Sequence, residues 1–193
     1  MIIPKIVDHE QFRLELLDRC FALFASKSFS SLTMREIAKQ LGVSTGTIYH
    51  YFPDKHELFK QMVQHLTVKD IMLGTIDLTG YSTEDKVRHL FRYLLDQESY
   101  FIHKTLLMIE YFRSTELEPE HKAMMQETET RYLTVLSQIL PAPEDVAFLF
   151  ALIHGLLIMR YLGGGTSMLE AHMEIAIEWV LSRENKYREP MAT

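Results

Sequence analysis

Hydrogen-bonding side chains are concentrated in the segment 42–55, whose sequence is GVSTGTIYHYFPDK. Hydroxyl groups, two tyrosines and a histidine lie between positions 44 and 51, a composition that the interior of a protein disfavours. Hydroxyl and aromatic donors can bind phosphate oxygens and base edges, and the threonine methyl group can contact the thymine methyl group. The segment therefore indicates an exposed helix that contacts nucleic acid.

The sequence predicts two short helices that position these side chains, over 34–41 and 45–51. Ile37, Leu41 and Ile48 supply the apolar face, the small Ala38 allows a close crossing, and Gly42 suits the turn. This is the pattern of a helix-turn-helix, whose second helix can enter the major groove. Its exposed face carries Ser44, Thr45, Thr47, Tyr49 and His50.

Two further residues are predicted to bind the DNA backbone. Thr33, at the start of the first helix, can offer its N–H and hydroxyl to a phosphate. Lys55 adds a cation at the start of the next helix. The alternative is that a glycine-linked helix pair is only part of a helical core, but this leaves the exposed Tyr49 and His50 unexplained.

The rest of the chain is also predicted to be helical, which gives an all-α fold with nine helices. Apolar residues recur at helical spacing, and extended β-branched alternation is scarce. Besides the two short helices, we expect helices over about 9–26, from 54 or 55 through 66, from 82 or 83 through 95, and over 100–113, 119–138, 144–162 and 167–185.

Charge and cysteine content limit the class of protein. The net charge of −6 arises from residues 61–193, because residues 1–60 hold 8 basic and 7 acidic side chains. A DNA-binding module on an acidic body and an ordinary acidic protein both fit this distribution. The single cysteine, Cys20, excludes an intramolecular disulfide and is predicted to be buried. With no signal peptide and no apolar run that could span a bilayer, the sequence predicts a cytoplasmic protein without membrane contact.

No sequence motif indicates an enzyme, a cofactor or a metal site. The chain has no phosphate-binding glycine loop, no GxSxG and no HExxH, and the GGG at 163–165 links two helices. His103 and Glu110 could suggest acid–base chemistry, but most helices offer such pairs. The histidines lack the spacing of a closed zinc site.

The stretch LTMREIAKQLGVSTGTIYHYFPDKHELF resembles the N-terminal domain of TetR-family transcriptional regulators, over about residues 10–60. The resemblance implies a TetR-like fold with a DNA-binding domain at 1–53 and a ligand-binding and dimerisation domain at 54–193. It also implies a homodimeric repressor that leaves a palindromic operator in double-stranded DNA when a small molecule binds. By the matched positions, Tyr51 joins the residues predicted to face DNA.

Three features depart from the family pattern. Thr45 stands where many relatives carry Lys or Arg, and Lys27-Ser28 replaces the usual glycine after the first helix. The leading arm is poor in arginine, and Lys5 and Arg13 are its only cations. Few phosphate-neutralising cations predict a shallow salt dependence of DNA binding, with affinity that depends on dimeric avidity.

The last two helices are predicted to form the homodimer, because each has more apolar surface than one core can cover. The expected interface residues are Phe150, His154, Met168, His172, Ile175 and Trp179. A monomer with a buried C-terminal hairpin is the alternative.

Soft and aromatic side chains between 62 and 125 predict a pocket for an apolar or amphipathic effector. The expected lining is His65, Phe91, Tyr100, His103, Met108, Phe112 and Met125. Ordinary core packing is the alternative for each of these residues. A DNA-bound scaffold or activator that recruits a protein partner, with no small-molecule effector, is the alternative function.

Overall fold

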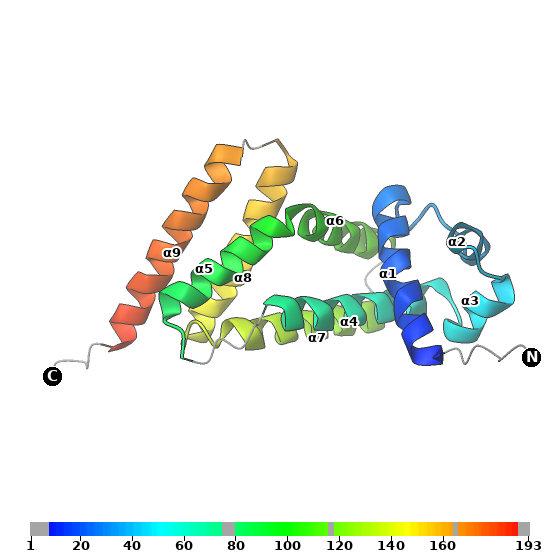
Figure 1. Cartoon of the computed structure of the whole chain (residues 1–193), viewed down its shortest axis with the longest axis horizontal. Coiled ribbons are helices and arrows are strands. Elements are labelled where there is room, and N and C mark those ends of the chain that lie inside the picture. Colours follow the sequence, from blue (N-terminus) through cyan, green and yellow to red (C-terminus); the bar gives the residue numbers. More distant parts are fainter. Residues whose placement is uncertain (1–7, 75–79, 116–117, 164–165, 189–193) are drawn as a thin grey trace, which may run out of the picture. The chain divides into compact units, whose positions relative to one another are not determined.

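The structure is a computed structural model that describes residues 8–74, 80–115, 118–163 and 166–188 (Figure 1). Over these residues the chain forms nine helices and no strand, which confirms the predicted all-α fold. The helices are α1 (His9–Lys27), α2 (Met34–Leu41), α3 (Thr45–Tyr51), α4 (Lys55–Gly74), α5 (Thr83–Asp96), α6 (Glu98–Ser114), α7 (Pro119–Leu136), α8 (Pro143–Tyr161) and α9 (Thr166–Arg188).

Side-chain caps explain where several of these helices begin. The Asp8 carboxylate accepts hydrogen bonds from the first turn of α1, and the Asp54 carboxylate accepts one from the Glu57 N–H at 2.8 Å. Ser82 caps α5 through the Asp85 N–H. These polar groups satisfy N–H donors that have no partner within the helix. Eight of the nine helices in the described residues match their predicted bounds to within three residues, whereas α4 extends to Gly74, past the predicted stretch that ends at 66.

The chain divides into two compact units. The first contains the described residues of 1–68 and 107–124. Its core includes Leu16, Phe24, Ile37, Ile48, Phe52 and Phe59, all at most 1% exposed. Tyr111 of α6 completes this core, because its ring stacks on Phe59 with centroids 3.9 Å apart and meets the edge of Phe29.

The second unit contains the described residues of 69–106 and 125–193. Helix α9 packs against both α5 and α8. The core between them includes Val87, Phe91, Leu149, Ala176 and Val180. An ion pair between Arg183 and Asp145, 2.7 Å apart, also joins α9 to the first turn of α8.

The units differ in extent from the predicted division at residue 53. Residues up to 68 pack with the N-terminal helices, as do residues 107–124. Helices α4, α6 and α7 therefore each contribute residues to both units. Among the described residues, none of the helices combines the length and apolar character needed to cross a lipid bilayer.

Candidate nucleic-acid interface

Helix α3 presents a polar face to solvent and one apolar side chain to the core. Ile48 is 0% exposed, and Ala38 of α2 is 1% exposed, which allows the two helices to cross closely. Gly42 occupies the left-handed region at φ 67°, where a glycine ends α2 without strain. On the opposite face, Tyr49 is 48% exposed and Thr45 and His50 are also exposed. These three side chains are free to meet a groove of DNA.

Ser44 and Thr47 stabilise the start of this helix. The Ser44 hydroxyl accepts a hydrogen bond from the Thr47 N–H at 2.9 Å, and the two hydroxyl oxygens lie 2.8 Å apart. Ser44 is exposed and Thr47 is half-buried. Ser44 therefore fixes the geometry of α3 as its N-cap, in addition to lying on the predicted DNA-facing side.

Thr33 already uses the donors that we expected it to offer to a phosphate. Its N–H and hydroxyl both donate to Glu36 Oε2, at 2.8 and 2.7 Å, in a complete capping box. The hydrogen bond from the Thr33 side chain, with that from its backbone, lowers the pKa of Glu36. A phosphate at this helix end must therefore displace the Glu36 carboxylate.

Lys55 is also engaged within the protein. Its ammonium donates to the carbonyl oxygens of Phe29 and Leu32, at 3.0 and 2.9 Å, and lies 4.2 Å from the centre of the Phe29 ring. Partial burial lowers the pKa of this ammonium. Lys55 was predicted to bind the DNA backbone. In the structure, its hydrogen bonds connect the start of α4 to the loop before α2.

Tyr51 is half-buried at the end of α3 and lies beside a residue that the sequence reasoning missed. Its hydroxyl is 2.8 Å from Nδ1 of His9, the first residue of α1. The ring of His9 also approaches His50, with centroids 6.3 Å apart. His9 belongs to no sequence motif, and it comes close to His50 and Tyr51 only because α1 packs beside α3 in the fold.

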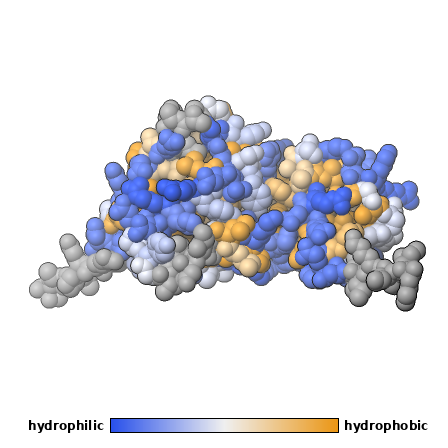
Figure 2. Space-filling view, in the orientation of Figure 1, coloured by the Kyte–Doolittle hydropathy of each residue, from blue (hydrophilic) through white to orange (hydrophobic). Residues whose placement is uncertain are grey.

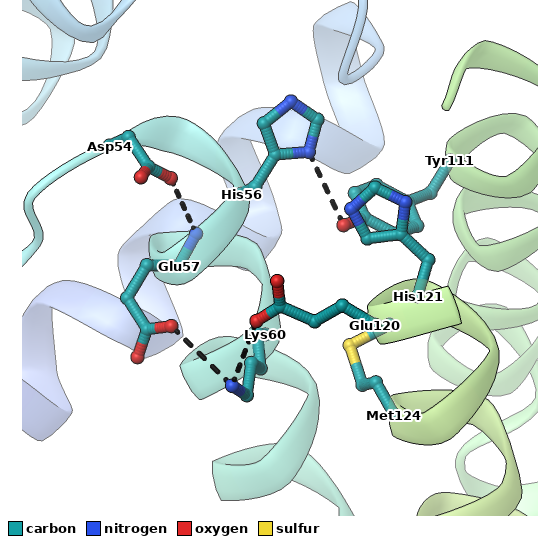
Figure 3. Close-up of a pocket in the computed structure, with 8 residues that line it drawn as sticks. All are labelled: Asp54, His56, Glu57, Lys60, Tyr111, Glu120, His121 and Met124. Atoms are coloured by element: carbon teal, nitrogen blue, oxygen red, sulfur yellow. Dashed lines mark hydrogen bonds and ion pairs between the residues drawn. The ribbon is translucent and has the colours of Figure 1, made fainter. Parts of the chain in front are cut away.

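The first unit contains a polar pocket whose lining residues come from the start of α4, from α6 and from the start of α7 (Figure 3). The rings of His56 and His121 stack at 5.2 Å, and His56 Nδ1 lies 3.3 Å from the Tyr111 hydroxyl. Lys60 bridges the carboxylates of Glu57 and Glu120, as the dashed lines of Figure 3 mark. These contacts join the first turns of α4 and α7. The lining is Asp54, His56, Glu57, Lys60, Tyr111, Glu120, His121 and Met124.

The predicted effector-binding residues are divided between the two units. His65, Met108 and Phe112 belong to the first unit, where His65 Nε2 pairs with the Asp18 carboxylate at 3.1 Å. The second unit holds the other four, which are Phe91, Tyr100, His103 and Met125. Phe91 is 2% exposed in the core, and His103 is exposed with Nδ1 2.6 Å from the Ser99 carbonyl oxygen.

The second unit instead contains a buried polar cluster around Asp70. The ammonium of Lys104 donates to Asp70 Oδ2 at 2.5 Å, and the hydroxyls of Tyr100 and Tyr132 donate to the same carboxylate at 2.6 Å each. Burial lowers the pKa of Lys104, against the effect of Asp70. Burial also raises the pKa of Tyr100, and the Asp70 charge adds to this. Only Tyr100 was predicted, because Asp70, Lys104 and Tyr132 lie far apart in the sequence.

Of the predicted interface residues on the last two helices, Ile175 is strongly exposed, and two large apolar residues that were not predicted, Phe148 and Met159, are exposed as well. Phe148, Met159 and Ile175 are 52%, 63% and 62% exposed, and the ring of Phe148 lies 4.7 Å from that of Trp179. Figure 2 shows hydrophobic residues at the surface among hydrophilic ones. Phe150 and His154 are half-buried, and Phe150 packs on Tyr132. His172 is exposed, and the side chain of Met168 lies outside the described residues.

The described residues include no group of three His, Cys, Asp or Glu side chains arranged to hold a metal ion. The site on α2 and α3 instead consists of a buried apolar contact, a left-handed glycine turn and an exposed face of hydroxyls, tyrosine and histidine. These features define a helix-turn-helix DNA-binding domain.

The family of this domain follows from comparison with known proteins. Residues 16–62 match the family described as bacterial regulatory proteins, tetR family. This match lies over the helix-turn-helix and confirms the resemblance to TetR-family regulators noted in the sequence.

Individual relatives and solved structures agree with this family. The negative transcriptional regulator IcaR of the biofilm operon icaADBC, from Staphylococcus aureus (strain Newman), is 23% identical over 90 residues, which are 46% of this chain. The match spans 48%, or about half, of that relative's length. This relative is described as a negative transcriptional regulator.

Two solved structures share the fold of almost the whole chain. A transcriptional regulator from Rhodococcus sp. Rha1 superposes with a TM-score of 0.74 and 22% identity, over 88% of this chain and 96% of its own. FadR from Bacillus subtilis, in complex with stearoyl-CoA, has a TM-score of 0.69 and 19% identity, over 88% and 97%. The all-helical fold predicted from the sequence is thus shared with these two transcriptional regulators.

Proposed function

We propose that this chain is a homodimeric transcriptional repressor that acts in the cytoplasm and leaves its operator when a small effector binds. The observation that carries the proposal is the exposed face of α3, where Thr45, Tyr49 and His50 project from a helix fixed by the buried Ile48. The family of residues 16–62 and the description of IcaR as a negative regulator support repression.

The chemistry of α3 favours hydrogen bonds over charge in the DNA contact. Its sequence, TGTIYHY, contains no lysine and no arginine. A tyrosine hydroxyl, an imidazole and threonine hydroxyls can bind base edges and phosphates, but they release few counterions. We therefore expect a salt dependence of the affinity that is shallow for a helix-turn-helix protein.

The exposed apolar surface of α8 and α9 supports a dimer through these helices. Phe148 and Met159 of α8 and Ile175 of α9 are large apolar side chains more than half exposed. Several large apolar side chains exposed on two neighbouring helices are typical of a protein–protein interface. In a homodimer, the two recognition helices would lie about 34–36 Å apart, in successive major grooves of a palindromic site.

The effector site is proposed in the interior of the second unit, near Asp70 and Lys104. Burying an ion pair costs desolvation energy that an apolar pair does not, so the net contribution of such a pair to stability is small. This favours a binding role for Asp70 and Lys104. The cluster could bind the polar end of an amphipathic molecule whose apolar part contacts the surrounding core. The stearoyl-CoA bound to FadR is an amphipathic molecule of this kind.

Effector binding would act by a population shift. The effector would favour a conformation in which the spacing of the two recognition helices no longer fits the operator. By thermodynamic linkage, operator DNA would then weaken effector binding by the same factor. A scaffold that recruits a protein partner would show no such reciprocal effect.

Selection of genomic fragments on the purified protein, followed by sequencing, tests this function. We expect a palindromic site near one or a few promoters, and release of that site by acyl-CoA thioesters or by metabolites of the neighbouring genes. Enrichment without release by small molecules would favour the scaffold or activator. If the folded dimer enriches no fragment at low salt, and mass spectrometry under native conditions finds no bound molecule, the DNA-binding function is wrong.

A further inference from the structure

His9 contacts the recognition helix through its last residue, Tyr51. His9 Nδ1 lies 2.8 Å from the Tyr51 hydroxyl oxygen, and the His9 ring lies near that of the exposed His50, with centroids 6.3 Å apart. The Tyr51 ring is held in place by Phe12, with centroids 5.7 Å apart, and by His50, with centroids 5.0 Å apart. The tyrosine hydroxyl is therefore fixed while its hydrogen-bond partner is a side chain that can gain a proton.

The direction of this hydrogen bond depends on the tautomer of His9 and on its protonation. A neutral imidazole with its hydrogen on Nε2 accepts at Nδ1, so Tyr51 then donates its only hydroxyl hydrogen to His9. A protonated imidazole donates from both nitrogens, so the Tyr51 oxygen must accept. The tyrosine hydrogen is then free for a phosphate oxygen, and a positive charge lies next to it.

We propose that His9 is a positioning residue for the DNA contact of Tyr51, and that proton uptake by His9 strengthens operator binding. The inference rests on the proposed DNA-binding function and adds a proton-sensitive phosphate contact to it. Histidine is the side chain whose charge ordinarily changes between about pH 5 and 8. The bound phosphate favours the protonated ring, so DNA binding and proton uptake stabilise one another.

The neighbouring charged groups leave this contact available to DNA. The Asp8 carboxylate caps α1 through the Glu10 and Gln11 N–H groups, and the Glu10 carboxylate pairs with Arg13 at 2.7 Å. Arg13 also donates to Gln61 of α4, which in turn donates to Glu57. The titratable rings beside His9 are those of His50 and Tyr51 from α3, and the nearest charged residues in the sequence are Asp8, Glu10 and Arg13.

Fluorescence anisotropy with the most enriched genomic fragment as a labelled duplex tests the inference at about pH 6 and about pH 8. We expect the wild-type dissociation constant to be about tenfold lower at the acidic pH, because each subunit takes up a proton on binding. His9→Gln should lose most of this ratio, and Tyr51→Phe should lose a similar part. His9→Lys, which always donates, should bind tightly at both values.

The matched control is His89→Gln on α5 in the second unit, which should keep the wild-type ratio. Circular dichroism at both pH values checks that each variant is folded. If His9→Gln keeps the wild-type ratio, His9 is not the group that takes up the proton. If Tyr51→Phe keeps the wild-type ratio while His9→Gln loses it, His9 acts through its charge and does not position Tyr51. That result would also overturn the inference. If the wild-type protein binds the labelled duplex at neither pH, the proposed DNA-binding function itself is wrong.

Discussion

Ser30 donates both its backbone N–H and its hydroxyl hydrogen to one oxygen of Glu110, at 3.1 and 2.9 Å. Ser30 lies in the loop before α2, and Glu110 lies on α6, a helix whose first residues belong to the second unit. The next residue of α6, Tyr111, stacks on Phe59. The end of α6 is therefore bonded to the loop that leads into the helix-turn-helix.

Glu110→Gln should destabilise the protein by about 1 kcal/mol at neutral pH, because a charged acceptor of two hydrogen bonds is lost. Partial burial raises the pKa of Glu110, but the hydrogen bonds from Ser30, together with those from Phe29 and Ser28, outweigh this and lower the pKa overall. This stability is present above the unfolded-state pKa and is lost as pH falls through the folded-state pKa.

Chemical denaturation between about pH 3 and 7 measures this difference. The variant should lose less stability than the wild type on acidification, and the exposed Glu129→Gln serves as the control. Equal acid sensitivity of wild type and Glu110→Gln would show that the Ser30 bonds contribute nothing.

Ser28→Gly should stabilise the protein by about 1 kcal/mol. Ser28 ends α1 with φ 68° and ψ 151°, a region that essentially only glycine occupies without strain. Ser28→Ala is the matched control, because it removes the hydroxyl but keeps the Cβ atom that causes the strain. Thermal unfolding should show a higher midpoint for the glycine variant only, and a gain in both variants would mean that the hydroxyl is the unfavourable group.

Cys20 should be inert to thiol reagents while the protein is folded. The side chain is 0% exposed, and burial raises the pKa of the thiol to about 12, so the reactive thiolate is scarce at neutral pH. An aromatic disulfide reagent should release its chromophore only after denaturant is added. Rapid reaction of the native protein would show that α1 opens locally or that Cys20 has a redox role.

Lys104→Met should cost about 3 kcal/mol of stability, because the Asp70 carboxylate stays buried without its cation. The double variant Asp70→Asn with Lys104→Met should recover part of this loss, since neither charge is then left unpaired. Urea denaturation of the two variants and the wild type measures the difference. A single variant as stable as the wild type would mean that water reaches the cluster.

The sequence was sufficient for the local structure of the DNA-binding domain. Ala38, Gly42 and Ile48 lie in one short stretch of the sequence, so the residues for the close helix crossing, the turn and the buried contact can be recognised together. The structure confirms each of these local roles. The same short-range rules also gave the helix bounds.

Contacts between distant segments could not be predicted in this way. Asp70 meets Lys104 and Tyr132, and His9 meets Tyr51, only because helices far apart in the sequence lie together. Lys55 shows the same limit, because its position at a helix start indicated a free cation, whereas the fold supplies two carbonyl oxygens to its ammonium.

A DNA titration of Tyr49→Ala tests the central claim, that α3 is the recognition helix, most directly. Tyr81→Ala is the matched control, because Tyr81 is 56% exposed on the second unit and Tyr49 is 48% exposed on α3. Loss of one base or phosphate contact in each subunit should weaken binding of the selected fragment at least about tenfold, with the dimer and its melting temperature unchanged. Unchanged affinity of Tyr49→Ala, with both variants folded, would contradict the assignment of α3.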